Sequence, residues 1–315
     1  MHKPMKDTYM KLITNEQVAE LICTQDAVEA MHKAFASAQN SAQQARVRTV
    51  AGKTMLSTMG AVLPGAGIAG TKVYITVNGR FSFAIVLFSM EDGTPLAAIE
   101  GDEMTGLRTA AATAVAAEYL APAKARTLAI IGTGVQARAH VSALCGVRNF
   151  SEILVAGVEC QAQFAVEAEE KTGIPARAVE IAEAADSADV LLTATRSKTP
   201  LFSGELLKNG VFVAAIGASK PDVRELDDTA IRRASAIVVE WKRQAREEAG
   251  DLVMCAPGTF EWSRVIELGD IVAGTTAYAR HASDIVIYKA VGVGLEDVAL
   301  AGLVYQRACA RYGWK

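Results

Sequence analysis

Three basic residues in the first third of the sequence have the chemistry to bind an anion. They are Arg48 in VRTV, Lys72 in GTKVYIT and Arg108 in MTGLRTAAA. Arg108 comes early in a segment otherwise made of alanine, threonine and leucine, where a charge is costly unless an anion meets it. Carboxylates such as Glu100 or Asp102 could be that anion, because paired arginines are common. The residues alone therefore leave both an anionic ligand and internal ion pairs open.

A glycine motif near the middle of the chain predicts a dinucleotide-binding turn. The run Gly132-Thr133-Gly134-Val135-Gln136-Ala137 follows the strand-like TLAII and opens a helical segment. The first glycine permits a tight turn, the second lets the backbone approach phosphates, and the alanine allows the helix to pack closely on the strand. The dipole of that helix favours a negative group at its start. A plain strand-to-helix turn is the alternative, and the surrounding strand–helix alternation favours the dinucleotide.

The residues that would distinguish NADH from NADPH follow the next strand, about 20 residues further on. In VAGVECQ the deciding positions hold Gly157 and Val158, which are neither acidic nor basic. Glu159 could hold the ribose hydroxyls of NAD, and Arg138 or Arg196 could hold a 2′-phosphate. We therefore predict NAD(P)H as the cofactor and leave its phosphate preference open.

Three helices are predicted before residue 122. TNEQ at residues 14–17 matches a helix capping box. The next segment repeats apolar residues at helical spacing, at Val28, Met31, Phe35 and Ala38. A long alanine-rich helix is expected from about residue 105 to residue 120, ending near a proline.

Between these helices, strand patterns predict a small antiparallel sheet. Residues 60–70, GAVLPGAGIAG, are interpreted as a flexible turn, although 65–70 match GxGxxG, because a strand and not a helix follows. In that strand, TKVYITV, Lys72 lies on the polar face, opposite a row of three β-branched residues. FSFAIVLFS and LAAIEG continue the sheet.

From Arg126 onward, short apolar runs alternate with helical segments. The strand-like runs are TLAII, EILVAG, DVLLTAT, VFVAAIG and AIVVE. This alternation is typical of a parallel sheet covered on both faces, so we predict an α/β fold with a Rossmann-type doubly wound sheet. The tail, about residues 284–312, is expected to be helical. We expect a substrate-binding and dimerisation lobe of α+β type at 1–120, with helix 296–315 packing back on it, and a dinucleotide-binding domain at 121–295.

Composition excludes several classes of protein. The chain has 315 residues, of which 51% are hydrophobic and 21% charged, with net charge −3, so it is neither disordered nor suited to nucleic acid. Its start, MHKPMKDTYM, lacks the apolar core of a signal peptide, and no apolar stretch approaches the roughly 20 residues of a membrane span. Five scattered cysteines indicate reduced thiols and a cytoplasmic location. His32 and His281 lack metal-ligand spacing, so no metal is expected.

Across nearly its whole length, the sequence resembles the ornithine cyclodeaminase/mu-crystallin family. The resemblance rests on VRTV, GTKVYIT, DGTPLAAIEGDEMTGLRTAAATAVAAEYLAP, IIGTGVQARAH, IGASKPDVRELDD and YKAVGVGLEDVALA. The LRTAA block followed by GTGVQA is quite specific, because a Rossmann protein of another kind would lack it.

The resemblance implies roles for individual residues. Those matching Arg48, Lys72 and Arg108 hold the substrate carboxylate in the family, and the one matching Arg108 also contacts the cofactor. The other cofactor contacts implied are Gly132, Gly134, Val135, Gln136, Thr195, Ile216, Gly217, Ser219, Ala290 and Val291. The resemblance also implies a homodimer formed through the substrate lobes, and a small imino or amino acid as ligand.

Two departures from the cyclodeaminase pattern argue against ornithine as the substrate. Cyclodeaminases carry an aspartate active in proton transfer where this chain has Ser219, and a hydroxyl cannot take a proton from an ammonium group unaided. They also carry a glutamate shortly after the first arginine, and RTVAGKTMLSTMG contains no acid. GASKPDVREL is instead similar to the mu-crystallin branch of ketimine reductases. Asp222 could replace the missing aspartate only if the loop were rearranged.

The resemblance therefore implies an NAD(P)H-dependent reductase of cyclic ketimine carboxylates. Δ1-Pyrroline-2-carboxylate would give proline, and Δ1-piperideine-2-carboxylate would give pipecolate. Lys72 is a candidate proton donor, because crowding by Arg48 and Arg108 should lower its pKa toward neutrality, and a water held by Ser219 is another candidate. An ornithine cyclodeaminase, an alanine-type amino-acid dehydrogenase and a non-catalytic carrier of small acids stay as alternatives.

Overall fold

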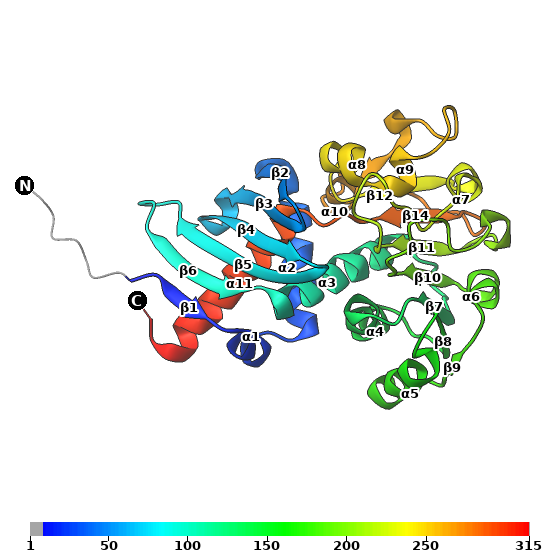
Figure 1. Cartoon of the computed structure of the whole chain (residues 1–315), viewed down its shortest axis with the longest axis horizontal. Coiled ribbons are helices and arrows are strands. Elements are labelled where there is room, and N and C mark those ends of the chain that lie inside the picture. The colour runs from blue at the N-terminus through cyan, green and yellow to red at the C-terminus, as the bar shows by residue number, and fades with distance from the viewer. Residues whose placement is uncertain (1–8, 315) are drawn as a thin grey trace, which may run out of the picture. The chain divides into compact units, whose positions relative to one another are not determined.

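The computed structural model describes residues 9–314 of the chain (Figure 1). The prediction that the N-terminus carries no signal peptide concerns mainly residues 1–8. These residues lie outside the described part of the chain, as does Lys315. Two units are distinguished: unit 1 runs to Arg108 and resumes at Val293, and unit 2 is Thr109–Gly292. None of the helices from residue 9 to residue 314 has the length and hydropathy needed to cross a membrane.

Unit 1 is built on a six-stranded sheet. Its elements are β1 (Lys11–Ile13), α1 (Asn15–Leu21), α2 (Thr24–Ala36), η1 (Ala38–Asn40), β2 (Ala42–Ala51), β3 (Thr54–Leu63), η2 (Pro64–Ala66), β4 (Ile68–Val77), β5 (Arg80–Ser89), β6 (Pro95–Glu100), the start of α3 (Asp102–Leu120), and α11 (Gly294–Tyr312). The predicted capping box is confirmed. The Thr14 hydroxyl accepts from the Gln17 N–H, and the Gln17 side chain accepts from the Thr14 N–H.

The sheet of unit 1 has the order β1-β6-β5-β4-β3-β2, and all neighbours are antiparallel except β1 and β6. Helix α11 packs across β3, β4 and β5, behind the sheet in Figure 1. The interpretation of residues 60–70 as one flexible turn is wrong in extent. Only η2 and Gly67, with φ of 67°, make the turn, and the flanking residues pair as β3 and β4. Gly60 belongs to β3 and lies against Gly294 of α11, where a Cβ on Gly294 would collide with the Gly60 backbone.

The alternation predicted for β4 is confirmed, but the buried face is the opposite one. Lys72 and Tyr74 are 1% and 8% exposed, whereas Ile75 and Val77 of the β-branched row are 38% and 39% exposed. The physical reason is that α11 covers the face with the lysine and brings carboxylates to it. Polarity along a single strand could not reveal that cover.

Unit 2 follows the predicted alternation of strands and helices. Its elements after α3 are β7 (Thr127–Ile131), α4 (Val135–Val147), β8 (Glu152–Ala156), α5 (Gln161–Thr172), β9 (Ala176–Ala178), α6 (Ile181–Ser187), β10 (Val190–Thr193), η3 (Gly204–Leu206), β11 (Phe212–Ala215), α7 (Asp228–Arg233), β12 (Ala236–Val239), α8 (Lys242–Glu248), α9 (Gly250–Val253), η4 (Trp262–Arg264), β13 (Ile266–Glu267), α10 (Leu268–Val272) and β14 (Val286–Lys289).

These strands form one parallel sheet in the order β13-β12-β14-β11-β10-β7-β8-β9. The predicted doubly wound α/β fold is confirmed. The chain leaves β7 toward β8 and later returns on its other side at β10, and ligands bind beside the carboxyl ends of strands at such a reversal.

The expectation of a helical tail over residues 284–312 is wrong at its start. Residues Val286–Lys289 form strand β14, which lies between β11 and β12, and α11 begins only at Gly294. All four residues of β14 are buried. The run IVIY at residues 285–288, which overlaps β14, is short, β-branched and aromatic, and this suits a central strand of a parallel sheet better than a helix.

Candidate active site

The predicted glycine turn joins β7 to α4. Gly132 has φ of 125°, and a Cβ there would collide with the Ala194 carbonyl oxygen, so this position requires glycine. Gly134 is the N-cap of the 13-residue helix α4. A Cβ built on Gly134 would have no described atom within 4 Å. The start of α4 thus offers backbone N–H groups beside open space, which fits the pyrophosphate of a dinucleotide.

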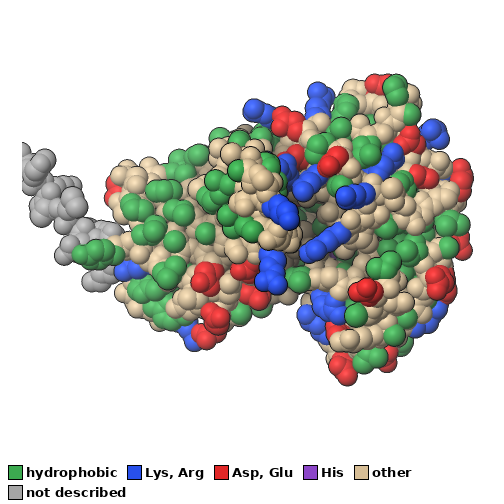
Figure 2. Space-filling model, in the orientation of Figure 1, with side chains coloured by type: hydrophobic (Ala, Val, Ile, Leu, Met, Phe, Trp, Pro, Cys, Tyr) green, Lys and Arg blue, Asp and Glu red, His purple; other side chains and the backbone are tan. Residues whose placement is uncertain are grey.

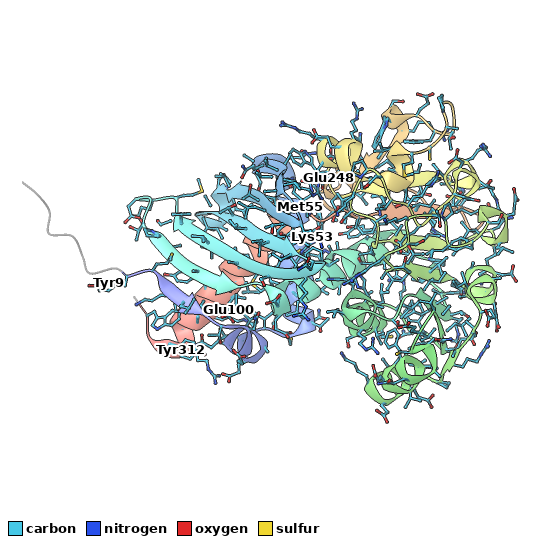
Figure 3. The ribbon with its side chains drawn as sticks, viewed as in Figure 1. Tyr9, Lys53, Met55, Glu100, Glu248 and Tyr312 are labelled. Atoms are coloured by element: carbon cyan, nitrogen blue, oxygen red, sulfur yellow. The ribbon has the colours of Figure 1, made fainter. Side chains whose placement is uncertain are left out.

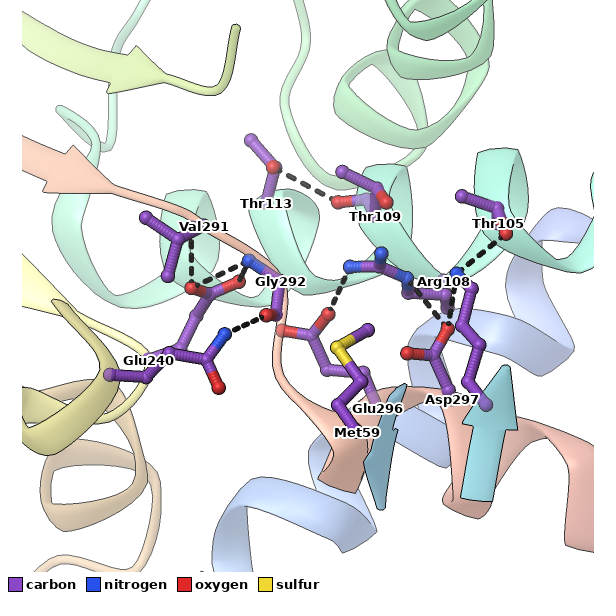
Figure 4. Close-up of polar contacts among 12 residues, drawn as sticks. Met59, Thr105, Arg108, Thr109, Thr113, Glu240, Val291, Gly292, Glu296 and Asp297 are labelled. Carbon is purple, nitrogen blue, oxygen red and sulfur yellow. Dashed lines mark hydrogen bonds and ion pairs between the residues drawn. The ribbon is translucent and has the colours of Figure 1, made fainter. Parts of the chain in front are cut away.

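The other predicted cofactor residues follow the ends of β10, β11 and β14, so they lie at the same edge of the sheet as the glycine turn. Two buried carboxylates shape this edge. Glu240 accepts the N–H groups of Val291, at 2.7 Å, and Gly292, at 2.9 Å (Figure 4). Glu225 accepts those of Thr195 and Gly217, both at 2.7 Å. Sequence reasoning missed both glutamates.

The side chains that could distinguish NADH from NADPH lie in different environments. Arg138 is paired with Glu167, with Nε and Oε2 2.7 Å apart, and also donates to the Thr133 carbonyl. Arg196 and Glu159 are exposed, and Asp222 is exposed in the loop after β11. Ser219 is half-buried in the same loop.

In unit 1, Arg108 contacts two acids of α11, Glu296 and Asp297 (Figure 4), and Lys72 contacts the second of them. Lys72 Nζ lies 3.0 Å from Asp297 Oδ1 and 2.8 Å from the Thr105 hydroxyl. Arg108 lies 2.6 Å from Glu296 Oε2 through NH1 and 3.1 Å from Asp297 Oδ1 through Nε. All four charged side chains are buried, with at most 7% exposed.

The ion-pair interpretation of Lys72 and Arg108 is thus correct, but the carboxylates named for it are wrong. Glu100 lies at the end of β6 and accepts the Asn15 N–H at the start of α1 (Figure 3). Asp102 accepts from the Asn15 side chain. The acids that pair with these cations lie far from them in the sequence. Glu296, for example, is 188 residues from Arg108. One signal in the sequence could have indicated these partners: two adjacent acids, Glu296 and Asp297, stand inside the otherwise apolar run GLEDVALA.

Arg48 lies on the same face of the sheet as Lys72. It pairs across strands with Ser57, which pairs with Tyr74, two residues along β4 from the lysine. Two arginines of β2 lie on this side of the sheet. Arg46 is the second of these, and its guanidinium lies 3.3 Å from Met59 Sδ, beside Lys72 in the sheet.

Burial lowers the pKa of Lys72 from 10.5 to about 8, Asp297 opposes the shift, and Arg108 and Arg46 add to it. The predicted direction is confirmed, but desolvation is the leading cause, and Arg46 is the arginine of β2 that contributes. Phe83 and Tyr74 also face the ammonium group, with ring centroids 4.5 Å and 5.9 Å from Nζ. A lysine whose pKa is about 8 is protonated at neutral pH and can still release its proton to a reacting group.

Comparison with known proteins places these features in a family. A model described as ornithine cyclodeaminase/mu-crystallin family matches residues 8–311. A Delta(1)-pyrroline-2-carboxylate reductase of Bacillus cereus is 38% identical over 241 residues, which are 75% of this chain and 73% of that protein.

Solved structures agree with that match. A probable ornithine cyclodeaminase from Bordetella pertussis Tohama I has a TM-score of 0.95 and 46% identity, covering 98% of this chain and 99% of that one. Thermococcus litoralis Delta(1)-pyrroline-2-carboxylate reductase, in complex with NADH and L-proline, has a TM-score of 0.92 and 29% identity, covering 96% and 98%. The chain belongs to the ornithine cyclodeaminase/mu-crystallin family.

Proposed function

We propose that the chain is an NAD(P)H-dependent ketimine reductase. Its substrate would be a cyclic ketimine carboxylate such as Δ1-pyrroline-2-carboxylate or Δ1-piperideine-2-carboxylate, reduced to L-proline or L-pipecolate. The observation that carries the proposal is the buried lysine of lowered pKa, held by Asp297 beside Arg108. It offers one site for a carboxylate and one transferable proton. The similarity to pyrroline-2-carboxylate reductases supports the choice of substrate.

In this proposal the residues of unit 1 bind and protonate the substrate. Arg48, Lys72 and Arg108 attract its carboxylate. The Lys72 ammonium donates a proton to the imine nitrogen as the C=N carbon becomes a C–H centre, and a water held by Ser219 is the competing donor. Asp297 keeps the ammonium charged, because its carboxylate favours the protonated form against burial.

The residues of unit 2 would hold the dinucleotide. Gly132, Gly134, Val135 and Gln136 would receive the pyrophosphate at the start of α4. Thr195, Ile216, Gly217, Ser219, Ala290 and Val291 would receive the nicotinamide half. Bound NAD(P)H supplies the hydride for the substrate carbon.

Ornithine cyclodeaminase is the second candidate, because the similar Bordetella pertussis protein is described as a probable one. The chemistry of this chain disfavours it. Ser219 has no carboxylate to take a proton, and Asp222 is exposed in the same loop. The residue of β3 opposite Arg48 in the sheet is Ser57, whose hydroxyl cannot neutralise a distal ammonium group.

The test is loss of nicotinamide absorbance with each cyclic ketimine, run separately with NADH and NADPH. Turnover with either ketimine supports the reductase and identifies the cofactor. Ammonia released from ornithine without ketimine turnover would establish the cyclodeaminase instead. Binding of a ketimine without turnover would favour a carrier.

We also propose a homodimer formed through unit 1. The sheet face that α11 leaves uncovered carries exposed apolar side chains, visible as the green side chains over this sheet in Figure 2. They include Val47, Leu56, Val62, Ile75, Val77 and Phe88, which are between 38% and 53% exposed. A contiguous apolar face of this kind marks an interface, and a second copy offers the same face.

A further inference from the structure

A fully buried carboxylate, Glu225, joins two loops at the carboxyl edge of the unit 2 sheet. Its Oε1 accepts the N–H and the hydroxyl of Thr195, at 2.7 Å and 2.8 Å. Its Oε2 accepts the Thr193 hydroxyl at 2.9 Å and the Gly217 N–H at 2.7 Å. The side chain is 0% exposed. Four donors around two oxygens suit a carboxylate anion, which only accepts hydrogen bonds.

The main chain at Glu225 is anchored in turn by Asp251 of α9. Asp251 Oδ1 accepts the N–H groups of Glu225 and Leu226, at 2.6 Å and 2.8 Å. Its Oδ2 lies 2.9 Å from Lys289 Nζ, at the end of β14, and Lys289 also donates to the Ala215 carbonyl at 3.1 Å. Asp251 and Lys289 are both 0% exposed. Glu225 is therefore fixed to the ends of two central strands.

The two loops that Glu225 joins are also in direct backbone contact. A Cβ on Gly217 would collide with the backbone of Thr195 and with the Glu225 carboxylate. A buried polar network whose members are all satisfied holds one geometry, and a half-satisfied network does not. Glu225 therefore helps to hold the loops after β10 and β11 in one arrangement.

We propose that Glu225 is a positioning residue for the nicotinamide half of the cofactor. This rests on the proposed use of NAD(P)H, with Thr195 and Gly217 contacting that half. The ADP-ribose half would be held mainly at the start of α4. The glycine turn before this helix touches the loop after β10 at Ala194, but none of the four donors to Glu225 belongs to the turn. Glu225 therefore controls how the nicotinamide is held, and leaves the hold on the ADP-ribose half unchanged.

The test compares two ligands on one variant of the full chain, by titration calorimetry. In Glu225→Gln, an amide NH2 faces an N–H or hydroxyl donor, and the unsatisfied donors push the loops apart. We expect the Kd for NADH to rise about tenfold or more, and the Kd for ADP-ribose, which lacks nicotinamide, to change less than about twofold. Thr193→Val removes one of the four donors at nearly constant volume and should raise the Kd for NADH about threefold.

Glu152→Gln is the matched control, because Glu152 accepts the Thr127 hydroxyl at 2.9 Å at the opposite, amino edge of the sheet. It should change neither Kd. If Glu225→Gln raises the Kd for NADH and for ADP-ribose equally, or leaves the Kd for NADH unchanged, the positioning role of Glu225 is wrong but the proposed function stands. If the native protein binds no NADH, both the positioning role and the proposed function are wrong. If Glu225→Gln does not fold, the same two titrations on Thr193→Val decide.

Discussion

Lys72 and Asp297 form a buried ion pair, with Nζ and Oδ1 3.0 Å apart and side chains 1% and 0% exposed. The lysine comes from the middle of a sheet strand, and the aspartate comes from the helix that covers the sheet. The same Oδ1 lies 3.1 Å from Arg108 Nε. One carboxylate oxygen therefore contacts two of the three predicted substrate-binding cations.

Removing this carboxylate should destabilise the protein strongly. Asp297→Asn leaves two buried cations facing an amide, and breaking a buried pair in this way costs about 3–5 kcal/mol in the free energy of unfolding. Denaturant unfolding measures the loss. The control is Glu20→Gln, because Glu20 and its partner Arg311 are 57% and 56% exposed, and such surface pairs contribute about 0–1 kcal/mol. Equal losses in the two variants would contradict this ranking.

The lowered pKa of Lys72 predicts how turnover depends on pH. If the ammonium group donates the proton, kcat is constant below about pH 8 and falls above it, because burial lowers the pKa to about 8. Asp297 raises this pKa, so Asp297→Asn should move the fall to lower pH. The unfolded chain keeps this proton up to 10.5, so the contribution of Lys72 to stability rises with pH between about 8 and 10.5. A kcat that stays constant up to pH 10.5 would show that Lys72 is not the donor.

Replacing Lys72 separates proton donation from substrate binding. Lys72→Met should lower kcat by about 10²- to 10⁴-fold, the usual contribution of a general acid, and should also raise KM. Steady-state kinetics with the ketimine measures both. Lys53→Met, at an exposed lysine in the turn between β2 and β3 (Figure 3), should change neither. Full kcat with only a raised KM would make Lys72 a binding residue, and the water near Ser219 would then be the donor.

A methyl group at Gly132 should abolish dinucleotide binding. In Gly132→Ala the new Cβ collides with the Ala194 carbonyl oxygen, and φ of 125° is unfavourable for alanine. Fluorescence titration with NADH should detect no binding. Gly146→Ala, in α4, meets no described atom within 4 Å and should stabilise that helix by about 1 kcal/mol without affecting NADH. Normal NADH affinity in Gly132→Ala would argue against the glycine turn as the binding site.

A charge on the uncovered sheet face should produce monomers. Ile75 pairs with Leu56 across β4 and β3, and the two are 38% and 45% exposed. Ile75→Glu would bury a carboxylate in the proposed interface, at a cost of several kcal/mol. Light scattering after gel filtration measures the mass. Val166→Glu, at a residue of α5 that is 57% exposed, should leave the mass unchanged. A monomeric native protein would contradict the dimer.

The strands of unit 2 and the glycine turn could be predicted because their signals are local. Apolar runs of four or five residues, with helices between them, indicate a buried parallel sheet wherever they occur. The same signal was present in IVIY at residues 285–288, where β14 begins, but the helical pattern that follows it obscured the boundary. Strands β2 and β3 were harder, since basic and polar residues alternate there with apolar ones that face an uncovered surface.

The partners of the basic residues could not be predicted, because they depend on contacts far apart in sequence. Lys72 meets Asp297 across 225 residues, and nearer acids such as Glu100 were equally reasonable in charge. Only the packing of α11 on the sheet decides between them. Glu225 was inside a motif that the sequence singled out, but its four donors come from three residues in two segments, the end of β10 with the loop after it and the loop after β11.

The central place of β14 has a consequence for synthesis of the chain on the ribosome. Strand β14 fills the gap between β11 and β12, and α11, which follows it, supplies the cover of the other sheet. A nascent chain that has not yet reached residue 286 can complete neither core. Neither sheet can therefore bury its apolar surface until residues 286–312 have emerged from the ribosome. Early termination in this stretch should leave no folded fragment and should increase the demand for chaperones.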